Sequence, residues 1–130
     1  METAQQNNTR DYSLVSPSAK SLIQLKARTN IPFAKETAAL IALPGKYLPD
    51  KDNKDVAFWK RVVHFEDRYW SVDQLLSSLE INNILEISSG YSFRGLEIVK
   101  DKQICYVDTD LSDLITQKKD LMASLQVSNT

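Results

Sequence analysis

Residues 82–95 read NNILEISSGYSFRG, and this stretch holds two of the three glycines in the chain. Its apolar run 84–87 includes two β-branched residues and predicts a β-strand that is buried on both faces. The small residues of 88–92 predict a turn, in which Gly90 either adopts a positive φ or lets a ligand approach the backbone. Residues 93–99 predict one or two helical turns. A strand, a small-residue turn and a helix in this order are typical of loops that bind phosphates or nucleotides.

The sequence that follows repeats this order of elements. The apolar run 103–107 predicts a second strand, and residues 108–112 predict the start of a helix whose apolar face includes Leu114, Leu121 and Leu125. Two strands joined through a helix are expected to be parallel, as in the first unit of a doubly wound sheet. Ligands of such sheets bind beyond the carboxyl ends of the strands, where this chain places the turn 88–92 and the acidic residues Asp108 and Asp110.

The first half of the chain predicts helices. Ser16 followed by Pro17 marks the start of a helix that continues to about residue 29, and a second helix is predicted over 34–43. Third and fourth helices are predicted over 56–70 and 72–79, after a charged surface loop at 46–55. Residues 1–13 are polar and are predicted to be a disordered tail. The chain therefore divides into this tail, a helical region over 14–79 and an α/β region over 80–130.

Composition limits the classes of function. The chain has 130 residues, 42% of them hydrophobic and 25% charged, which is typical of one globular domain or part of one. Its formal net charge of −1 disfavours nucleic acid and anionic membranes as partners. The single cysteine excludes an internal disulfide, and the start METAQQNNTR has no apolar stretch for a signal peptide or a membrane anchor. These features predict a cytoplasmic location.

The spacing of the polar residues indicates the kind of ligand. Asp110 follows Gly90 by 20 residues, which suits a carboxylate that accepts hydrogen bonds from ribose hydroxyls. The turn lacks the early glycines of a pyrophosphate loop, and Glu86 stands within the first strand. A nucleoside that carries an amino acid fits better, because Glu86 or the backbone near Gly90 can meet its ammonium group. S-adenosylmethionine is such a molecule. Alternatively, Asp110 is an N-cap of the following helix and binds no ligand.

Three segments resemble a known family. The runs ILEISSGYSFRG and YVDTDLSDLITQK resemble the first motif and the second-strand motif of class I S-adenosylmethionine-dependent methyltransferases. Among these they resemble most the leucine carboxyl methyltransferase family, which includes polyketide O-methyltransferases of the tetracenomycin type. HFEDRYWSVDQLL resembles the family's helix with an arginine that holds the methionine carboxylate, a role that would belong to Arg68. One of Lys20, Lys26 and Arg28 would assist it. The resemblance covers residues 14–125.

The resemblance implies a Rossmann-like fold with S-adenosylmethionine as cofactor and O-methyl transfer to a carboxylate or hydroxyl of a small molecule or a protein. The implied cofactor-binding residues are Arg68, Glu86, Ser88, Gly90 and Asp110. Ser88 and Ser92 stand where the family pattern has glycines. The family's sheet has seven strands, whereas this chain predicts two. We therefore expect a truncated or split form, self-associated or loosely packed by itself, that transfers methyl groups only when a second polypeptide completes the sheet.

Other interpretations stay open at this point. The chain is alternatively a non-catalytic half-domain that binds a partner chain through its free sheet edge, and a nicotinamide-binding fragment ranks last because glycines are few. Arg68 is alternatively a solvated charge on an amphipathic helix. His64 has no partners for a catalytic triad, Cys105 is predicted to be buried and inert, and one histidine with one cysteine predicts no metal site. No catalytic residue is assigned.

Overall fold

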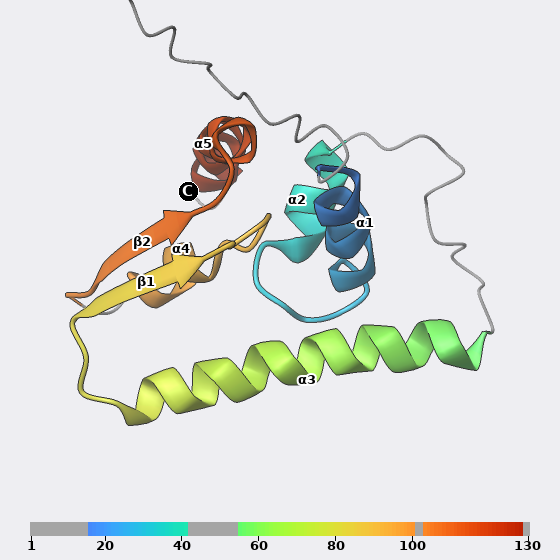
Figure 1. Ribbon diagram of the computed structural model, residues 1–130, viewed down its shortest axis with the longest axis horizontal. Helices are drawn as coiled ribbons and strands as arrows, with labels where there is room; N and C mark the ends of the chain where they lie inside the picture. Colours follow the sequence, from blue (N-terminus) through green and yellow to red (C-terminus); the bar gives the residue numbers. More distant parts are fainter. Residues whose placement is uncertain (1–15, 42–54, 101–102, 129–130) are drawn as a thin grey trace, which may run out of the picture.

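The computed structural model of the chain describes residues 16–41, 55–100 and 103–128, with side chains from residue 17 to residue 125 (Figure 1). The predicted tail 1–13 and the predicted loop, apart from its last residue, lie outside the described residues. The elements in order are α1 (Ser16–Lys26), α2 (Ala34–Leu40), α3 (Val56–Ser78), β1 (Asn83–Ile87), α4 (Arg94–Ile98), β2 (Cys105–Thr109) and α5 (Ser112–Ser128). The described residues therefore form a mixed fold of helices and a small sheet.

The sheet consists of the parallel pair β1 and β2, in which Ile84 lies opposite Tyr106 and Glu86 lies opposite Asp108. The predicted order strand, helix, parallel strand, helix is confirmed. Helix α4 packs closely on β2, because a Cβ atom on Gly95 would lie 2.7 Å from Cδ1 of the Tyr106 ring. That contact explains the second glycine of the stretch 82–95, since any side chain there would force the helix or the Tyr106 ring to move.

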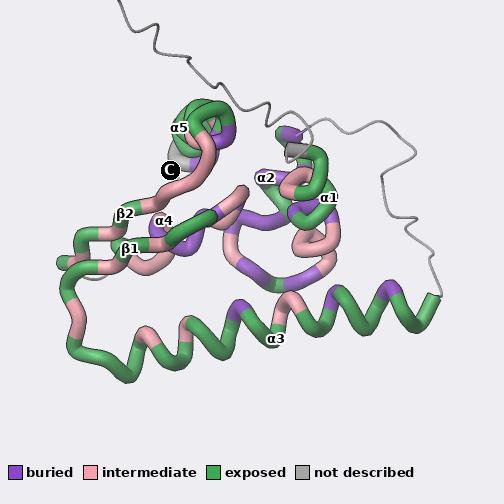
Figure 2. The backbone as a smooth tube through the Cα atoms, viewed as in Figure 1, coloured by how far each residue is buried: buried purple, intermediate pink, exposed green. Residues whose placement is uncertain are grey.

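One face of the sheet is open. Side chains alternate along both strands, and those that point away from the helices are exposed: Leu85 is 60% exposed, Ile87 74% and Val107 47%. Figure 2 shows this alternation along both strands. The prediction that 84–87 is buried on both faces is wrong, because no element of the described chain covers the outer face. Cys105, predicted to be buried, is exposed on the same face for the same reason.

The helices differ from prediction in two places. The two helices predicted over 56–70 and 72–79 are one helix, α3, because neither glycine nor proline interrupts it at Ser71. The Ser71 hydroxyl donates a hydrogen bond of 2.8 Å to the carbonyl of Asp67 within the helix. At the start of α3, the Asp55 carboxylate caps the helix by accepting a bond of 2.9 Å from the N–H of Ala57. Helix α2 ends at Leu40, earlier than predicted, where the chain becomes extended.

The core lies between the helical region and the turn that follows β1. Its larger cluster joins residues of α1 and α2 to Tyr69 of α3, Tyr91 of the turn and Leu114 of α5. A smaller cluster joins Phe33 and Phe93 to Leu125 near the end of α5. Both clusters connect the N-terminal helices with the α/β region, so α1 is held against the carboxyl ends of the strands. This packing positions the site described below.

Candidate functional site

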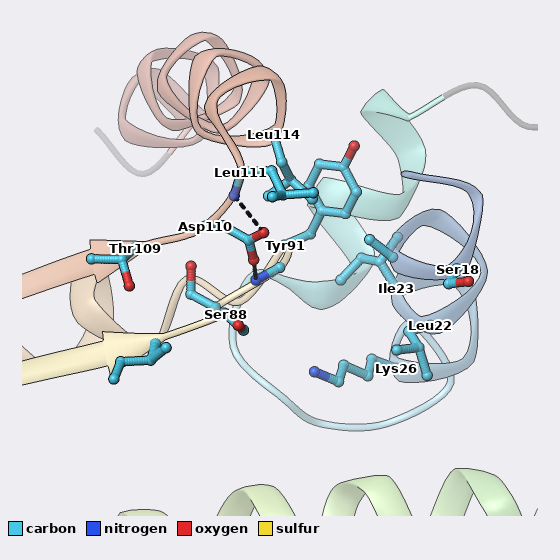
Figure 3. Close-up of a pocket in the computed structure, with 14 residues that line it drawn as sticks. Ser18, Leu22, Ile23, Lys26, Ser88, Tyr91, Thr109, Asp110, Leu111 and Leu114 are labelled. Atoms are coloured by element: carbon cyan, nitrogen blue, oxygen red, sulfur yellow. Dashed lines mark hydrogen bonds between the residues drawn. The ribbon is translucent and has the colours of Figure 1, made fainter. Parts of the chain in front are cut away.

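A cavity of about 710 Å³ lies between α1, the turn after β1 and the start of α5 (Figure 3). This volume is within the range of about 300–1,000 Å³ that is usual for small-molecule sites. Its wall is largely apolar on the side of α1 and α5, whereas the turn and the end of β2 supply polar groups. The lining residues are Ser18, Ala19, Leu22, Ile23, Lys26, Ile87, Ser88, Ser89, Gly90, Tyr91, Thr109, Asp110, Leu111 and Leu114.

The turn that lines the cavity contains two residues in the left-handed backbone region. Gly90 has a φ of 56° and Ser88 a φ of 57°. Nothing lies within 4 Å of where a Cβ atom on Gly90 would be, so its backbone angle, and not the space around it, favours glycine there. At Ser88 the same conformation carries a cost of about 1–2 kcal/mol for a residue with a side chain. Strain of this kind is concentrated at functional sites.

Asp110 connects the end of β2 to the turn. Its Oδ2 accepts a hydrogen bond of 2.8 Å from the N–H of Gly90, and its Oδ1 accepts one of 2.7 Å from the N–H of Leu111. The spacing of 20 residues seen in the sequence is therefore a direct contact across the cavity edge. A carboxylate has room for about four hydrogen bonds, so two positions remain for a ligand. The second bond also holds the backbone just before α5 begins.

Lys26 is the only one of the three basic candidates, Lys20, Lys26 and Arg28, that lines the cavity. Figure 3 shows its side chain extending from α1 toward the turn. Burial is the main cause that lowers its pKa from the usual value, and the nearby charges of Arg94 and Arg68 lower it further against the opposing effect of Glu86. Within the described part of the chain, its ammonium makes no hydrogen bond or ion pair. It is thus a partly buried cation beside the cavity that feels the charge of Glu86 but forms no direct ion pair with a described residue.

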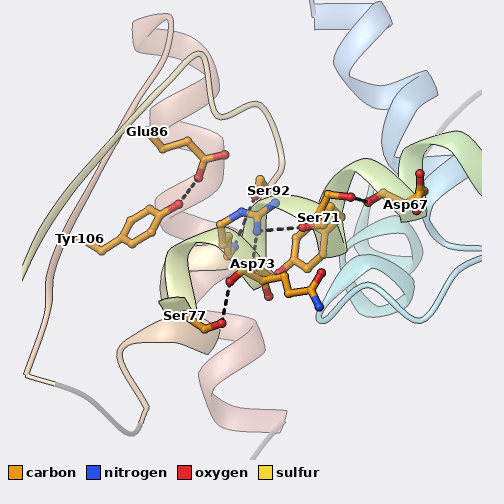
Figure 4. A network of polar contacts seen from close by, with 10 residues as sticks. Asp67, Ser71, Asp73, Ser77, Glu86, Ser92 and Tyr106 are labelled. Carbon is orange, nitrogen blue, oxygen red and sulfur yellow. Dashed lines mark hydrogen bonds and ion pairs between the residues drawn. The ribbon is translucent and has the colours of Figure 1, made fainter. Parts of the chain in front are cut away.

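Two of the five predicted site residues do not line the cavity. Glu86 faces the helices, and its carboxylate accepts a hydrogen bond of 2.7 Å from the Tyr106 hydroxyl (Figure 4). Burial and this bond raise the pKa of Tyr106. Arg68 is exposed on α3 and influences the cavity only through its charge on Lys26. The structure therefore brings Ser88, Gly90 and Asp110 together, as the family resemblance implies, and adds Lys26 to them.

A buried arginine that the sequence interpretation did not single out lies on the helix side of the sheet. Arg94 is 8% exposed, forms an ion pair with Asp73 and donates a hydrogen bond of 3.2 Å to the carbonyl of Tyr69. Its guanidinium carbon also lies 3.9 Å from the centre of the Tyr69 ring. These contacts join α4 to α3 (Figure 4). No local pattern in the sequence marks this pair, because 21 residues separate its members.

Some site classes find no support among the described residues. No group of three or more histidine, cysteine, aspartate or glutamate side chains is placed to hold a metal ion in residues 16–41, 55–100 and 103–125. None of the helices in the described ranges is both long and apolar enough to span a bilayer. Comparison of the chain with protein-family models, curated proteins and solved structures finds no significant match. The functional conclusion therefore depends on the cavity itself.

Proposed function

We propose that this chain forms the S-adenosylmethionine-binding part of a Rossmann-like methyltransferase that transfers a methyl group to an oxygen of a carboxylate or a hydroxyl. The observation that carries the proposal is the cavity in which a partly buried lysine without a direct ion pair and a carboxylate at a strand end meet at a strained turn. The ligand that suits them has a carboxylate at one end and ribose hydroxyls at the other. A cytoplasmic location belongs to the same proposal.

Each end of the cavity would hold one part of the ligand. The ammonium of Lys26 would pair with the methionine carboxylate, which supplies the direct ion pair that this cation lacks. The two unused acceptor positions of Asp110 would receive the ribose hydroxyls. The backbone of the turn at Gly90 would approach the ligand closely, since this residue carries no side chain. The apolar side chains Leu22 and Leu114 would cover the remaining surface of the ligand.

The bound sulfonium would supply a methyl group that is already activated for transfer. The chain's contribution would then be to fix the orientation of the donor and to exclude water from its apolar side. No side chain of the described residues is assigned as a general base. The acceptor oxygen would be held by residues beyond the cavity that α1, the turn and α5 form.

The binding proposal is tested by calorimetric titration with S-adenosylhomocysteine and, in parallel, with adenosine, which lacks the amino acid. We expect Lys26→Met to weaken S-adenosylhomocysteine binding by about 1.5–3 kcal/mol, or roughly ten- to a hundredfold, because a charge-assisted bond is lost. Adenosine binding should change little. Lys20→Met is the matched control, because Lys20 lies on the same helix outside the cavity wall. Equal losses for both ligands, or no binding by the wild type, would contradict the proposal.

The ribose contact is tested with Asp110→Ala. This change should weaken both S-adenosylhomocysteine and adenosine by about 1.5–3 kcal/mol, since both carry the ribose. Asp113→Ala is the control, because Asp113 is exposed in the first turn of α5. Asp108→Ala should weaken the binding of both ligands less than Asp110→Ala does. The family resemblance predicts that Arg68→Lys also weakens binding. If only Lys26 holds the carboxylate, Arg68→Lys should have little effect on binding. Methyl transfer is assayed with radiolabelled S-adenosylmethionine and simple carboxylic-acid and phenol acceptors.

The second candidate function is binding of a partner chain, and the open sheet face favours it. Leu85, Ile87 and Val107 form an exposed apolar surface on the outer face of β1 and β2, and apolar surfaces of this kind commonly mark protein interfaces. A second polypeptide that completes the sheet, or another copy of this chain, would cover them. Light scattering after size exclusion tests this: Leu85→Lys should reduce association, whereas Leu40→Lys, at a 50% exposed position of α2, should not. A wild-type chain that stays monomeric would exclude another copy of this chain as the partner.

A further inference from the structure

Lys118 is a buried cation that contacts the turn after β1, strand β2 and the residue just before α4. It lies on α5 and is only 5% exposed. Its Nζ donates a hydrogen bond of 2.8 Å to the Ser89 hydroxyl and forms an ion pair of 2.9 Å with Oδ2 of Asp108. It also lies 5.4 Å from the centre of the Phe93 ring, just before α4. One ammonium therefore joins the turn, the end of β2 and the start of α4.

The position of this lysine on its helix is unusual. Residues 114, 118, 121 and 125 form the inward stripe of α5, and the other three are leucines that are buried or partly buried. Removing an ion pair from water costs free energy that the pairing alone often fails to recover, so a pair of apolar side chains at 108 and 118 would serve the core at least as well. The lysine is therefore better explained by what it holds than by the stability that it adds.

Lys118 holds the turn at Ser89, the residue next to the strained Ser88. Ser89 lies between Ser88 and Gly90, both of which have a left-handed backbone. At Ser88, which carries a side chain, this conformation persists only where the surroundings fix it. Ser89 is fixed twice: its N–H donates a bond of 3.0 Å to the carbonyl of Thr109, and its hydroxyl accepts the bond from Lys118. In this turn conformation the N–H of Gly90 donates its hydrogen bond to Asp110.

We propose that Lys118 is a positioning residue, which acts through Ser89 to set the turn backbone and so the mutual placement of Gly90 and Asp110. It does this from outside the cavity, since Lys118 is not among the lining residues. The consequence for binding rests on the proposed S-adenosylmethionine site, whereas the consequence for the turn does not. The two are therefore measured separately.

The consequence for binding is measured with four chains: the wild type, Ser89→Ala, Lys118→Met and the double variant. Because Lys118 acts through Ser89, each single change should weaken S-adenosylhomocysteine binding about five- to tenfold, the size expected for one hydrogen bond. The double variant should be no weaker than Lys118→Met. Lys119→Met, at the neighbouring exposed lysine, should bind as the wild type does. Losses that multiply in the double variant, or unchanged binding in Lys118→Met, would overturn the proposal.

The consequence for the turn is measured without ligand, by amide hydrogen exchange in NMR spectra. Only three glycines occur in the chain, so the Gly90 signal is readily assigned. Its exchange should accelerate at least about fivefold in Lys118→Met and in Ser89→Ala, because a loosened turn opens more often. Exchange of the Thr37 amide, which is bonded to Phe33 in the fully buried part of α2, should stay unchanged and so exclude global unfolding.

The outcomes separate the two proposals. If the wild type does not bind S-adenosylhomocysteine but Gly90 exchange responds as described, the proposed function fails and the positioning role of Lys118 stands. If Gly90 exchange is the same in all chains, the positioning role is wrong whatever the chain binds. Should Lys118→Met fail to fold, Ser89→Ala decides the matter, because it removes only the link to the turn and keeps the ion pair with Asp108.

Discussion

Arg94 and Lys26 are both cations that are at least partly buried, but only Arg94 has direct polar partners. Between α3 and α4, Arg94 has an ion pair with Asp73, a hydrogen bond to the Tyr69 carbonyl and the face of the Tyr69 ring. At the cavity wall, Lys26 has no hydrogen bond or ion pair with the described residues. The first region uses its charge to hold elements together. In the second region Glu86 attracts the Lys26 ammonium without touching it, so a position for a direct contact with an added anion remains, which is why we assign Lys26 to binding.

The largest effect is expected from Arg94→Met. It leaves the Asp73 carboxylate partly buried without its partner, and breaking a buried pair in this way costs about 3–5 kcal/mol. Urea unfolding at low temperature measures the loss. Arg68→Met on the exposed side of α3 is the control and should change the free energy of unfolding by no more than about 0.5 kcal/mol. A loss below about 1 kcal/mol in Arg94→Met would remove the distinction between the two regions.

The double variant Arg94→Met/Asp73→Leu should be more stable than Arg94→Met alone by about 2–3 kcal/mol. Replacing both members of a buried pair by apolar residues is often neutral, so most of the loss in the single variant reflects the stranded carboxylate. The same urea titrations provide the comparison. If the double variant is as unstable as the single one, the ring contact with Tyr69 and packing, and not the charge pair, explain the role of Arg94.

Gly95→Ala tests close packing in the same region without changing any charge. Its Cβ would lie 2.7 Å from the Tyr106 ring, so α4 or the ring must move, and overpacking of this kind costs about 1–3 kcal/mol. Thermal unfolding measures the effect. Combining Gly95→Ala with Tyr106→Leu should restore part of the stability, because the smaller side chain leaves room for the methyl group. An unchanged melting temperature in Gly95→Ala would show that the contact between α4 and β2 is loose.

Lys26→Met should affect stability in the opposite direction to Arg94→Met and Gly95→Ala, and by a smaller amount. Since the cation is partly desolvated and forms no direct ion pair, its removal should leave the free energy of unfolding unchanged or raise it by up to about 0.5 kcal/mol, even as ligand binding is weakened. Chemical unfolding of this variant beside Lys20→Met measures the difference. A clear destabilisation would indicate that Lys26 serves the fold as Arg94 does.

The smallest effect is the pH dependence of the difference in free energy of unfolding between Lys26→Met and the wild type. Because the pKa of Lys26 is lowered in the folded chain, the unfolded chain binds more protons between this lowered pKa and 10.5, so the free energy of unfolding rises with pH in that window. The advantage of Lys26→Met over the wild type should therefore shrink as pH approaches 10.5. Burial also raises the pKa values of Tyr69 and Tyr106, which lowers stability above pH 10, but both variants share this contribution. A constant difference would contradict the lowered pKa.

The sequence predicted the parts of the fold that depend on local patterns. The order of strands and helices from 84 onward, the parallel pairing and the position of Asp110 beside the turn all follow from periodicity and spacing, whereas the hydrogen bond from Gly90 to Asp110 was not predicted. The partner of Arg94 was not predictable, because Asp73 lies 21 residues away on another helix. The burial of Lys118 was not predictable for a different reason: Lys118 and Lys119 are adjacent, and two adjacent lysines are expected to be solvated. The choice of Lys26 over Lys20 and Arg28 required the packing of α1 against the turn, which no single-sequence pattern encodes.

Cys105 is exposed on the open sheet face, so its thiol can be labelled chemically to probe this face. It is the only cysteine in the chain, and it lies on the outer face of β2 next to Asn83 of β1. A thiol reagent with a coloured or fluorescent product therefore reports on this one surface, without any engineered residue. Protein that covers the face should slow the reaction of the thiol, and a ligand confined to the cavity should not. The rate of a single alkylation thus becomes a direct titration of how much of the sheet is covered.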